Sequence, residues 1–278
     1  MELNDLKPKK DSRAALPLHT NFSAKEIPRL RDKEMSAVFT FSTDDGHPSD
    51  MKMAELLGKN GLNGTFYIPI TNREGLPVMC QSQILDVGRQ FEIGSHTYDH
   101  CYLKNVGLVE ANRQITEGKK RLEDLLGKPV AGFSYPGGKY REAHAAMVQS
   151  AGFEYARSSM NLCFDAGLSR FEIPTTIQFY PHTKAVYFRN FLKAGRWNKR
   201  ADGLRLALQH NSWLERMYAL FDHSCEQESV FHLWAHSVDI NRINAWNDID
   251  RFFGYVAKKV AVQNRLTNQQ LASREYFI

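Results

Sequence analysis

Short runs of β-branched and aromatic residues alternate with longer segments of helical periodicity along most of the chain. Apolar runs of a few residues, bounded by turn-forming residues, are typical of buried β-strands. Seven such runs occur, at 37–43, 64–70, 91–95, 130–136, 153–159, 170–176 and 229–236. The pattern therefore predicts seven strands.

Between several of these runs, apolar residues recur three and four positions apart, as on one face of a helix. The segments with this spacing are about 49–60, 82–89, 106–126 and 139–151. Gly61, Gly127 and Gly152 follow three of them, where a left-handed C-cap would lie. Alternating strands and helices predict repeated βα units, so we expect a largely parallel α/β sheet or barrel with helices outside.

Two segments depart from this rhythm. The interval 181–228 is longer than an ordinary crossover and has helical patterns, which indicates a helical insertion before the last strand. Residues 1–34 are rich in Lys, Pro, Asp and Ser and lack periodicity, which indicates an extended N-terminal arm. The predicted organisation is this arm followed by one barrel domain, 35–278, that includes the insertion.

Composition narrows the class of protein. Of 278 residues, 42% are hydrophobic and 24% are charged, as in soluble globular proteins. A net charge of +5 is too small at this length to indicate a nucleic-acid partner. The four cysteines are scattered, and no apolar run has the length of a secretory signal or membrane span, so we expect reduced thiols and a cytoplasmic protein. The oligomeric state is left open.

Chemically suitable residues follow the first predicted strand. Asp44 and Asp45 precede Gly46 and Pro48, a sequence typical of a sharp turn. Because neighbouring side chains point in different directions there, one carboxylate can bind a cation while the other faces a water on it. An ordinary Asp-Gly turn with a solvated aspartate would have the same sequence.

The third predicted strand is followed by two histidines, His96 and His100. If the chain turns into a helix there, their Cβ atoms lie roughly 5–6 Å apart, close enough to bind one metal ion. Two histidines and one carboxylate form a frequent catalytic zinc set that leaves a position open for water. Two unrelated loop histidines would have the same spacing, so the pair alone decides nothing.

Two further strand ends carry functional groups. The fourth ends in Tyr135 and Pro136 followed by two glycines, where an exposed backbone N–H could stabilise an oxyanion, although a simple turn looks the same. The last strand ends in His236, which is expected in the site. His232 lies deeper along the same face and is expected to be a hydrogen-bonded core histidine.

The ordered motifs Asp-Asp-Gly, the histidine pair, Tyr-Pro-Gly and a late strand ending in histidine resemble the polysaccharide deacetylase family, also called the NodB-homology family or carbohydrate esterase family four. The resemblance spans about 36–259. It implies a distorted barrel of about seven parallel strands and a divalent metal ion, usually zinc. By position, Asp45, His96 and His100 resemble the metal ligands.

The resemblance also implies a reaction, the hydrolysis of an N-acetyl group on a sugar. Asp44 corresponds to the general base that takes a proton from water, whose pKa a zinc ion lowers to about 7. His236 corresponds to the general acid that protonates the departing amine. The backbone N–H of Tyr135 corresponds to the oxyanion donor.

The sequence departs from the family pattern at several positions. Ser134 stands where the family has an arginine that orients the base, and Arg157 is a candidate replacement, although it could equally be a surface residue. Trp234 stands where leucine is usual and could line the sugar site. Either Asp165 or Asp239 could raise the pKa of His236, and the sequence does not choose between them.

The insertion and the predicted location bear on the substrate. Basic and aromatic residues alternate at helical spacing over 184–205, which would suit a membrane surface or a lipid-phosphate-linked sugar. A helix that packs its aromatics on the barrel would show the same pattern. We expect an N-acetylated sugar precursor, nucleotide- or lipid-linked, of a cell-surface polysaccharide such as the O-antigen of lipopolysaccharide. The alternatives are a hydrolase of a non-sugar amide and an inactive, metal-containing carbohydrate-binding protein.

Overall fold

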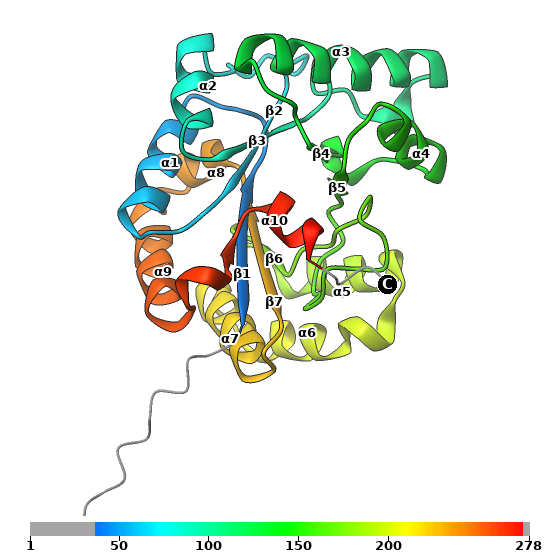
Figure 1. Ribbon diagram of the computed structural model, residues 1–278. Helices are drawn as coiled ribbons and strands as arrows, with labels where there is room; N and C mark the ends of the chain where they lie inside the picture. The colour runs from blue at the N-terminus through cyan, green and yellow to red at the C-terminus, as the bar shows by residue number, and fades with distance from the viewer. Residues whose placement is uncertain (1–36, 275–278) are drawn as a thin grey trace, which may run out of the picture. The chain divides into compact units, whose positions relative to one another are not determined.

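A computed structural model describes residues 37–274, whose strands all pair in parallel in one curved sheet (Figure 1). Seven strands form the main path, in the order β5-β4-β3-β2-β1-β7-β6, and β8 pairs with β1 beside it. The strands are β1 Val38–Thr43, β2 Thr65–Ile68, β3 Glu92–Ser95, β4 Gly132–Ser134, β5 Tyr155–Arg157, β6 Ile177–Gln178, β7 Val230–Ala235 and β8 Arg265–Leu266.

The two edges of this sheet approach each other through the segment that leads into β6. Ile173 forms a parallel bridge with Arg157 of β5, and its N–H donates to the Ala156 carbonyl at 2.9 Å. A few residues later, Ile177 pairs with Leu233 of β7. The same segment therefore contacts both edges, and the predicted distorted barrel of parallel strands is confirmed.

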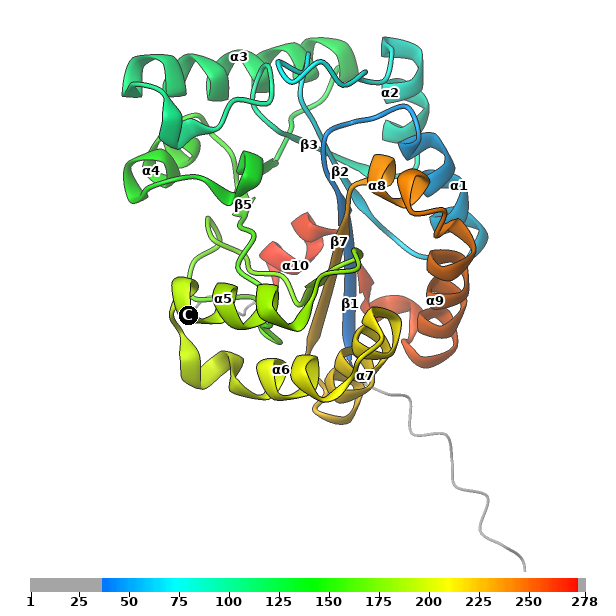
Figure 2. The same cartoon turned by 180° about the vertical axis from the view of Figure 1, so that it is seen from behind.

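Helices cover the outside of the sheet (Figures 1 and 2). The four helices predicted in the first half occur within a few residues of their expected bounds, and Gly127 caps the longest of them with φ 64°. The helices are α1 Asp50–Lys59, α2 Gln81–Gly88, α3 Leu108–Leu126, α4 Glu142–Ser150, α5 Lys184–Ala194, α6 Trp197–Gln209, α7 Trp213–Glu226, α8 Ser237–Arg242, α9 Trp246–Lys259 and α10 Asn268–Ser273, with short 3₁₀ turns at Leu103–Asn105, Pro136–Gly138 and Val262–Asn264.

The sixth strand differs from its prediction at 170–176. Glu172 closes a turn on Ser169, and Pro174 has no N–H to donate, so regular pairing begins only at Ile177. The two-residue strand β8 has no periodic signal and was not predicted. The predicted insertion is confirmed, because α5, α6 and α7 occupy the interval before β7.

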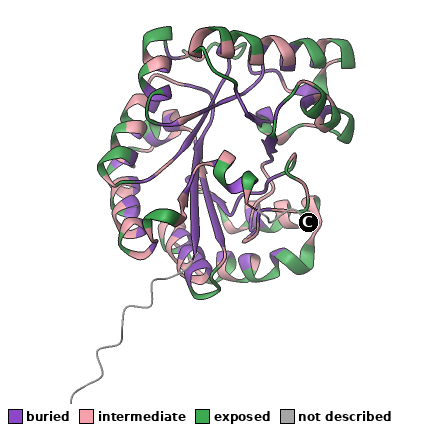
Figure 3. Ribbon diagram, viewed as in Figure 1, coloured by how far each residue is buried: buried purple, intermediate pink, exposed green. Residues whose placement is uncertain are grey.

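The core lies along the strands and beneath the helices (Figure 3). Every residue of β1 is buried, and Phe39 and Phe41 alternate with Thr40 and Ser42. The phenyl rings of Phe39 and Phe231 stack with centroids 6.2 Å apart, on the outer side of the barrel where α7 packs. The polar side chains of β1 therefore face the barrel interior. The C-terminal end of β1 leads directly into Asp44.

Three remaining predictions concern the N-terminal arm, membrane-spanning helices and the cysteine thiols. The predicted N-terminal arm, 1–34, lies outside the described residues. Within 37–274, no helix combines the length and the apolar character that crossing a bilayer requires. The four cysteines are free thiols, as expected: Cys80, Cys101, Cys163 and Cys225.

Candidate active site

The two aspartates leave β1 in a turn that separates their side chains. Asp45 has φ 77° and Gly46 has φ 60°, both in the left-handed region. A Cβ atom at Gly46 would lie 2.7 Å from Cγ2 of Ile68, so glycine is required there. An aspartate held at positive φ costs free energy, and such strain is concentrated at functional sites.

The segment carrying His96 and His100 is a turn, not the helix that the sequence analysis considered as a condition for their meeting. Thr97 and His100 have φ 66° and 62°, which no α-helix accommodates. Tertiary contacts set this shape: the Tyr98 carbonyl accepts the backbone N–H of Ile70 at 2.8 Å. The two imidazoles nevertheless meet, with ring centroids 5.1 Å apart.

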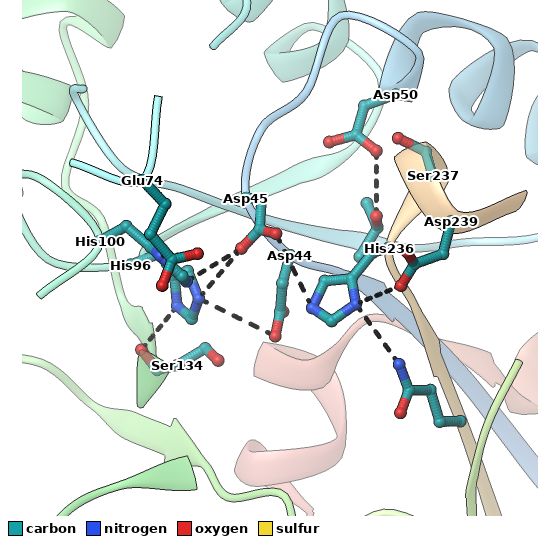
Figure 4. Close-up of polar contacts among 12 residues, drawn as sticks. Asp44, Asp45, Asp50, Glu74, His96, His100, Ser134, His236, Ser237 and Asp239 are labelled. Carbon is teal, nitrogen blue, oxygen red and sulfur yellow. Dashed lines mark hydrogen bonds and ion pairs between the residues drawn. The ribbon is translucent and has the colours of Figure 1, made fainter. Parts of the chain in front are cut away.

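Three of the predicted ligand atoms converge on one point (Figure 4). Asp45 Oδ1 lies 3.6 Å from His96 Nε2 and 3.2 Å from His100 Nε2, and all three residues are buried. A tetrahedral zinc ion with bonds of ~2.0–2.1 Å sets its ligands roughly 3.3 Å apart. Asp45 Oδ1 has no hydrogen-bond donor although it is buried, so a divalent cation fits this set.

A hydrogen bond holds the His96 imidazole in the orientation that a cation needs. His96 Nδ1 donates to the Ser134 carbonyl at 2.8 Å, which leaves Nε2 with its lone pair toward Asp45. Burial lowers the pKa of His96 to about 4, so it is neutral near pH 7. His100 Nδ1 lies 3.6 Å from a carboxylate oxygen of Glu74, a residue that the sequence analysis missed.

Protons compete with a cation for the same atoms. Burial opposes ionisation of Asp45, but His100, His236 and His96 hold its pKa well below the usual value. Burial would lower the pKa of His100, but contact with Asp45 raises it overall. Cation binding would therefore displace a proton from His100, so affinity falls with decreasing pH.

Arg157 supplies the guanidinium that position 134 lacks. Its Nη2 donates to Oδ1 of Asp44, and both side chains are buried, so Arg157 is not a surface residue. The guanidinium lies between two aromatic rings, 5.3 Å from the Tyr67 centroid and 5.0 Å from the Trp234 centroid. The sequence analysis proposed that Trp234 lines the sugar site; in the structure its ring packs on the Arg157 guanidinium that contacts Asp44.

His236 stands on the other side of the aspartates from the histidine pair (Figure 4). Its Nδ1 lies 3.2 Å from Oδ2 of Asp239, while Asp165 instead pairs with Arg196 at 3.3 Å. The choice that the sequence left open therefore falls on Asp239. Burial opposes protonation of His236, but Asp239 and Asp45 together raise its pKa to about 9.

Two further residues considered in the sequence analysis, His232 and Tyr135, have different surroundings. His232 is buried and contacts Ser42 Oγ and the Pro174 carbonyl, each at 3.0 Å, which confirms a core histidine. The Tyr135 N–H faces the Arg157 carbonyl across the β4–β5 ladder at 3.4 Å, a long contact. An oxyanion on this N–H would have to compete with that carbonyl.

A pocket of about 260 Å³ opens beside these groups. Asp44, Tyr135, Trp234 and His236 line one side of it. The lining also includes residues that the sequence analysis did not assign to the site: Asn161, Gln178, His182, Arg189 and Asn190. No local sequence motif predicts these lining residues, because their positions depend on tertiary contacts that hold the helical insertion.

The anchor of two of these lining residues is Arg200, a fully buried residue of α6. Its guanidinium donates to the Asn161 carbonyl at 2.7 Å and to the Asn190 carbonyl at 3.3 Å. These bonds join the loop after β5 to the C-terminal half of α5. Arg200 thus orders two pocket residues and is not available to any external partner.

Comparison with known proteins agrees with the geometry. Residues 30–156 match the family model described as polysaccharide deacetylase. The match covers a little less than half of the chain and shows that this part resembles the family in sequence. The match confirms the predicted resemblance to this family over 30–156. No curated protein sequence matches the chain significantly.

Solved structures share the fold. A putative polysaccharide deacetylase from Mycobacterium smegmatis aligns over 86% of this chain and 90% of its own, with 15% identity and a TM-score of 0.59. Puue allantoinase aligns over 88% and 93%, with 13% identity and a TM-score of 0.60. The Streptococcus pyogenes deacetylase PplD, solved with acetate, aligns over 49% and 62%, with 14% identity and a TM-score of 0.46. The chain thus spans less than two thirds of PplD. At these identities, the first two alignments show a shared fold alone.

Proposed function

We propose that this protein is a metal-dependent hydrolase that removes the N-acetyl group from a sugar. The observation that carries the proposal is the convergence of Asp45, His96 and His100 between two further titratable groups. Asp44 Oδ2 lies 4.0 Å from His96 Nε2 on one side, and His236 Nε2 lies 3.8 Å from Asp45 Oδ2 on the other. A base, a cation site and an acid are thus adjacent.

Asp45, His96 and His100 would hold the cation, for which we propose zinc because of the two imidazole donors. A divalent cation supplies a Lewis acid that lowers the pKa of water and polarises an amide carbonyl. The protein contributes a buried ligand set in which the Ser134 carbonyl orients His96 by accepting from its Nδ1.

Asp44 is the proposed general base. The Arg157 guanidinium pairs with its carboxylate and fixes one oxygen, so that the other oxygen faces the histidine pair and the pocket. Water that loses a proton to Asp44 attacks the amide carbonyl carbon. The Tyr135 N–H is the proposed donor to the oxygen that becomes negative.

His236 is the proposed general acid. Its pKa of about 9 keeps it protonated near neutral pH, and Asp239 holds the Nδ1 proton, so Nε2 presents the proton that can be transferred. Transfer to the sugar nitrogen makes that nitrogen a neutral amine leaving group and completes cleavage of the C–N bond.

For the substrate we propose an N-acetylated sugar precursor of a cell-surface polysaccharide, such as the O-antigen of lipopolysaccharide, processed in the cytoplasm. The pocket volume lies just below the ~300–1,000 Å³ of sites for drug-sized ligands, which suits one sugar unit. Asn161, Gln178 and Asn190 offer amide groups for hydroxyls. Arg189 in the same lining suits the phosphate of a nucleotide- or lipid-linked sugar.

The test joins metal analysis with acetate release from a panel of N-acetylated sugars, free, nucleotide-linked and lipid-linked. We expect a bound divalent metal ion and acetate release from at least one phosphate-linked sugar. Asp44→Asn should retain the metal and lose about 10²–10⁴-fold in rate. Bound metal without acetate release from any sugar would favour the two alternatives, a non-sugar amide hydrolase or an inactive carbohydrate-binding protein.

A further inference from the structure

The outer face of α5 and the start of α6 expose large apolar side chains next to the pocket. Phe188, Leu192 and Trp197 are 50%, 53% and 56% exposed, although folding usually removes such groups from water. Phe188 and Leu192 lie one helical turn apart. Trp197 Nε1 donates to the Phe191 carbonyl at 3.2 Å, so its indole lies beside the end of the same helix.

Basic side chains flank these apolar groups. We use "the α5–α6 patch" for Lys184, Phe188, Arg189, Leu192, Lys193 and Trp197. No acidic residue occurs anywhere in 184–201. Figure 2 shows α5 and α6 side by side on one flank of the barrel. The patch takes Trp197 from α6 and its other residues from α5.

The charges of the patch are not neutralised within the described residues. Lys184, Arg189 and Lys193 form no ion pair there, whereas exposed cations elsewhere commonly do, such as Lys120 with Asp124 at 2.7 Å. Of the other basic residues in 184–205, Arg196 pairs with Asp165, Arg205 pairs with Asp202 and Arg200 is buried, whereas Lys199 is exposed and forms no ion pair within the described residues. The patch therefore combines uncompensated positive charge with exposed aromatic surface.

We propose that the α5–α6 patch docks this protein on an anionic lipid surface. Helices that lie in a membrane interface carry Lys and Arg beside exposed Trp, Phe and Leu, because the cations attract acidic headgroups while the apolar groups enter the acyl boundary.

Docking in this way would bring the pocket to the membrane. Val186, Tyr187 and Asn190 line the pocket from the same helix, α5, whose outer side carries Phe188 and Leu192. A sugar attached to a lipid could then enter the pocket while its lipid stays in the bilayer. The binding surface itself does not depend on the proposed reaction, so the two can fail separately.

The test is co-sedimentation of the full chain with vesicles of phosphatidylcholine alone and of phosphatidylcholine and phosphatidylglycerol in equal parts. We expect binding to the anionic vesicles that weakens with added salt. Phe188→Ser, Leu192→Ser and Lys193→Glu combined should weaken it more than about tenfold, since one basic residue alone contributes about fivefold. Their side chains do not line the pocket, so acetate release from a soluble substrate should persist.

A matched control exposes the same kinds of residue on another helix. Leu108→Ser, Val109→Ser and Lys120→Glu on α3 remove two exposed apolar groups and reverse one charge, and should leave vesicle binding unchanged. Equal binding by the two triple variants, or no binding by the wild type, overturns the proposal. A wild-type dimer that the patch variant alone converts to monomer also overturns it, in favour of an interface between copies. Thermal melts of both variants verify folding.

Discussion

Arg157 shows how one residue can satisfy a requirement that the neighbouring strand leaves open. Ser134 of β4 and Arg157 of β5 are directly paired in the sheet, so the guanidinium enters the site from the adjacent strand. The sequence offered Arg157 as a candidate, but it could not distinguish a buried from an exposed arginine. That distinction depends on Tyr67 and Trp234, which come from distant parts of the chain.

Arg157→Lys tests whether the guanidinium that enters from β5 orients Asp44. Lysine keeps the charge but cannot span both rings and the carboxylate as a planar guanidinium does. We expect kcat to fall roughly tenfold to a hundredfold while the metal content stays unchanged, measured by acetate release and metal analysis. Arg113→Lys, in the exposed pair with Glu110, is the control and should change neither. An unchanged kcat in Arg157→Lys would show that the Arg157 guanidinium is not needed to orient Asp44.

The pKa of His236 sets the expected alkaline limit of activity. The proposed acid must be protonated, so kcat/KM should fall as pH rises through its pKa, which Asp239 and Asp45 raise to about 9. A cation bound at Asp45 repels the imidazolium, so the limit should lie at or below that value. Asp239→Asn removes the largest favourable contact and should move the limit to lower pH. A pH–rate profile with the same limit in both proteins would contradict the assignment.

At the scale of elements, regular segments were predictable and their tertiary placement was not. Helices α1 to α4 and most strands follow from local periodicity because one face of each is buried. The turn at 95–100 does not, because α3 and the segment after β2 impose it from outside. The pocket wall from α5 also has no local signal, since the buried Arg200 sets its position through long-range hydrogen bonds.

Gly118 of α3 tests that external control of the histidine turn. A Cβ atom there would lie 2.8 Å from the Thr97 carbonyl carbon and 3.0 Å from the Tyr98 nitrogen, so Gly118→Ala must displace the turn between the two histidines. We expect a loss of about 1–3 kcal/mol in the free energy of unfolding and weaker zinc binding, measured by denaturant unfolding and calorimetric titration.

Gly58→Ala is the matched helical control for that variant. Its Cβ would meet nothing closer than Gln90 Oε1 at 3.9 Å, in helix α1. Because alanine favours helix over glycine, it should gain about 0.5–1 kcal/mol and leave zinc binding unchanged. Gly118→Ala with wild-type stability and zinc affinity would show that the turn does not depend on the approach of α3.

At the scale of the whole molecule, the barrel gathers functional groups from distant segments at the C-terminal ends of its strands. Asp44 and Asp45 follow β1, the histidine pair follows β3, Arg157 ends β5 and His236 follows β7. The family pattern and the order of these groups were visible in the sequence because each follows a strand. The sequence could not predict the tertiary contacts, such as which carboxylate pairs with His236 and which helices line the pocket.

The central claim is that Asp45, His96 and His100 hold one metal ion on which N-acetyl hydrolysis depends. Its most direct test is acetate release, measured while chelator-stripped protein is titrated with zinc against an N-acetylated sugar. The account predicts no activity without metal, a linear rise to one ion per chain and then a plateau, and no rise in His96→Ala. Acetate release by the metal-free protein, or an undiminished rise in His96→Ala, would contradict it.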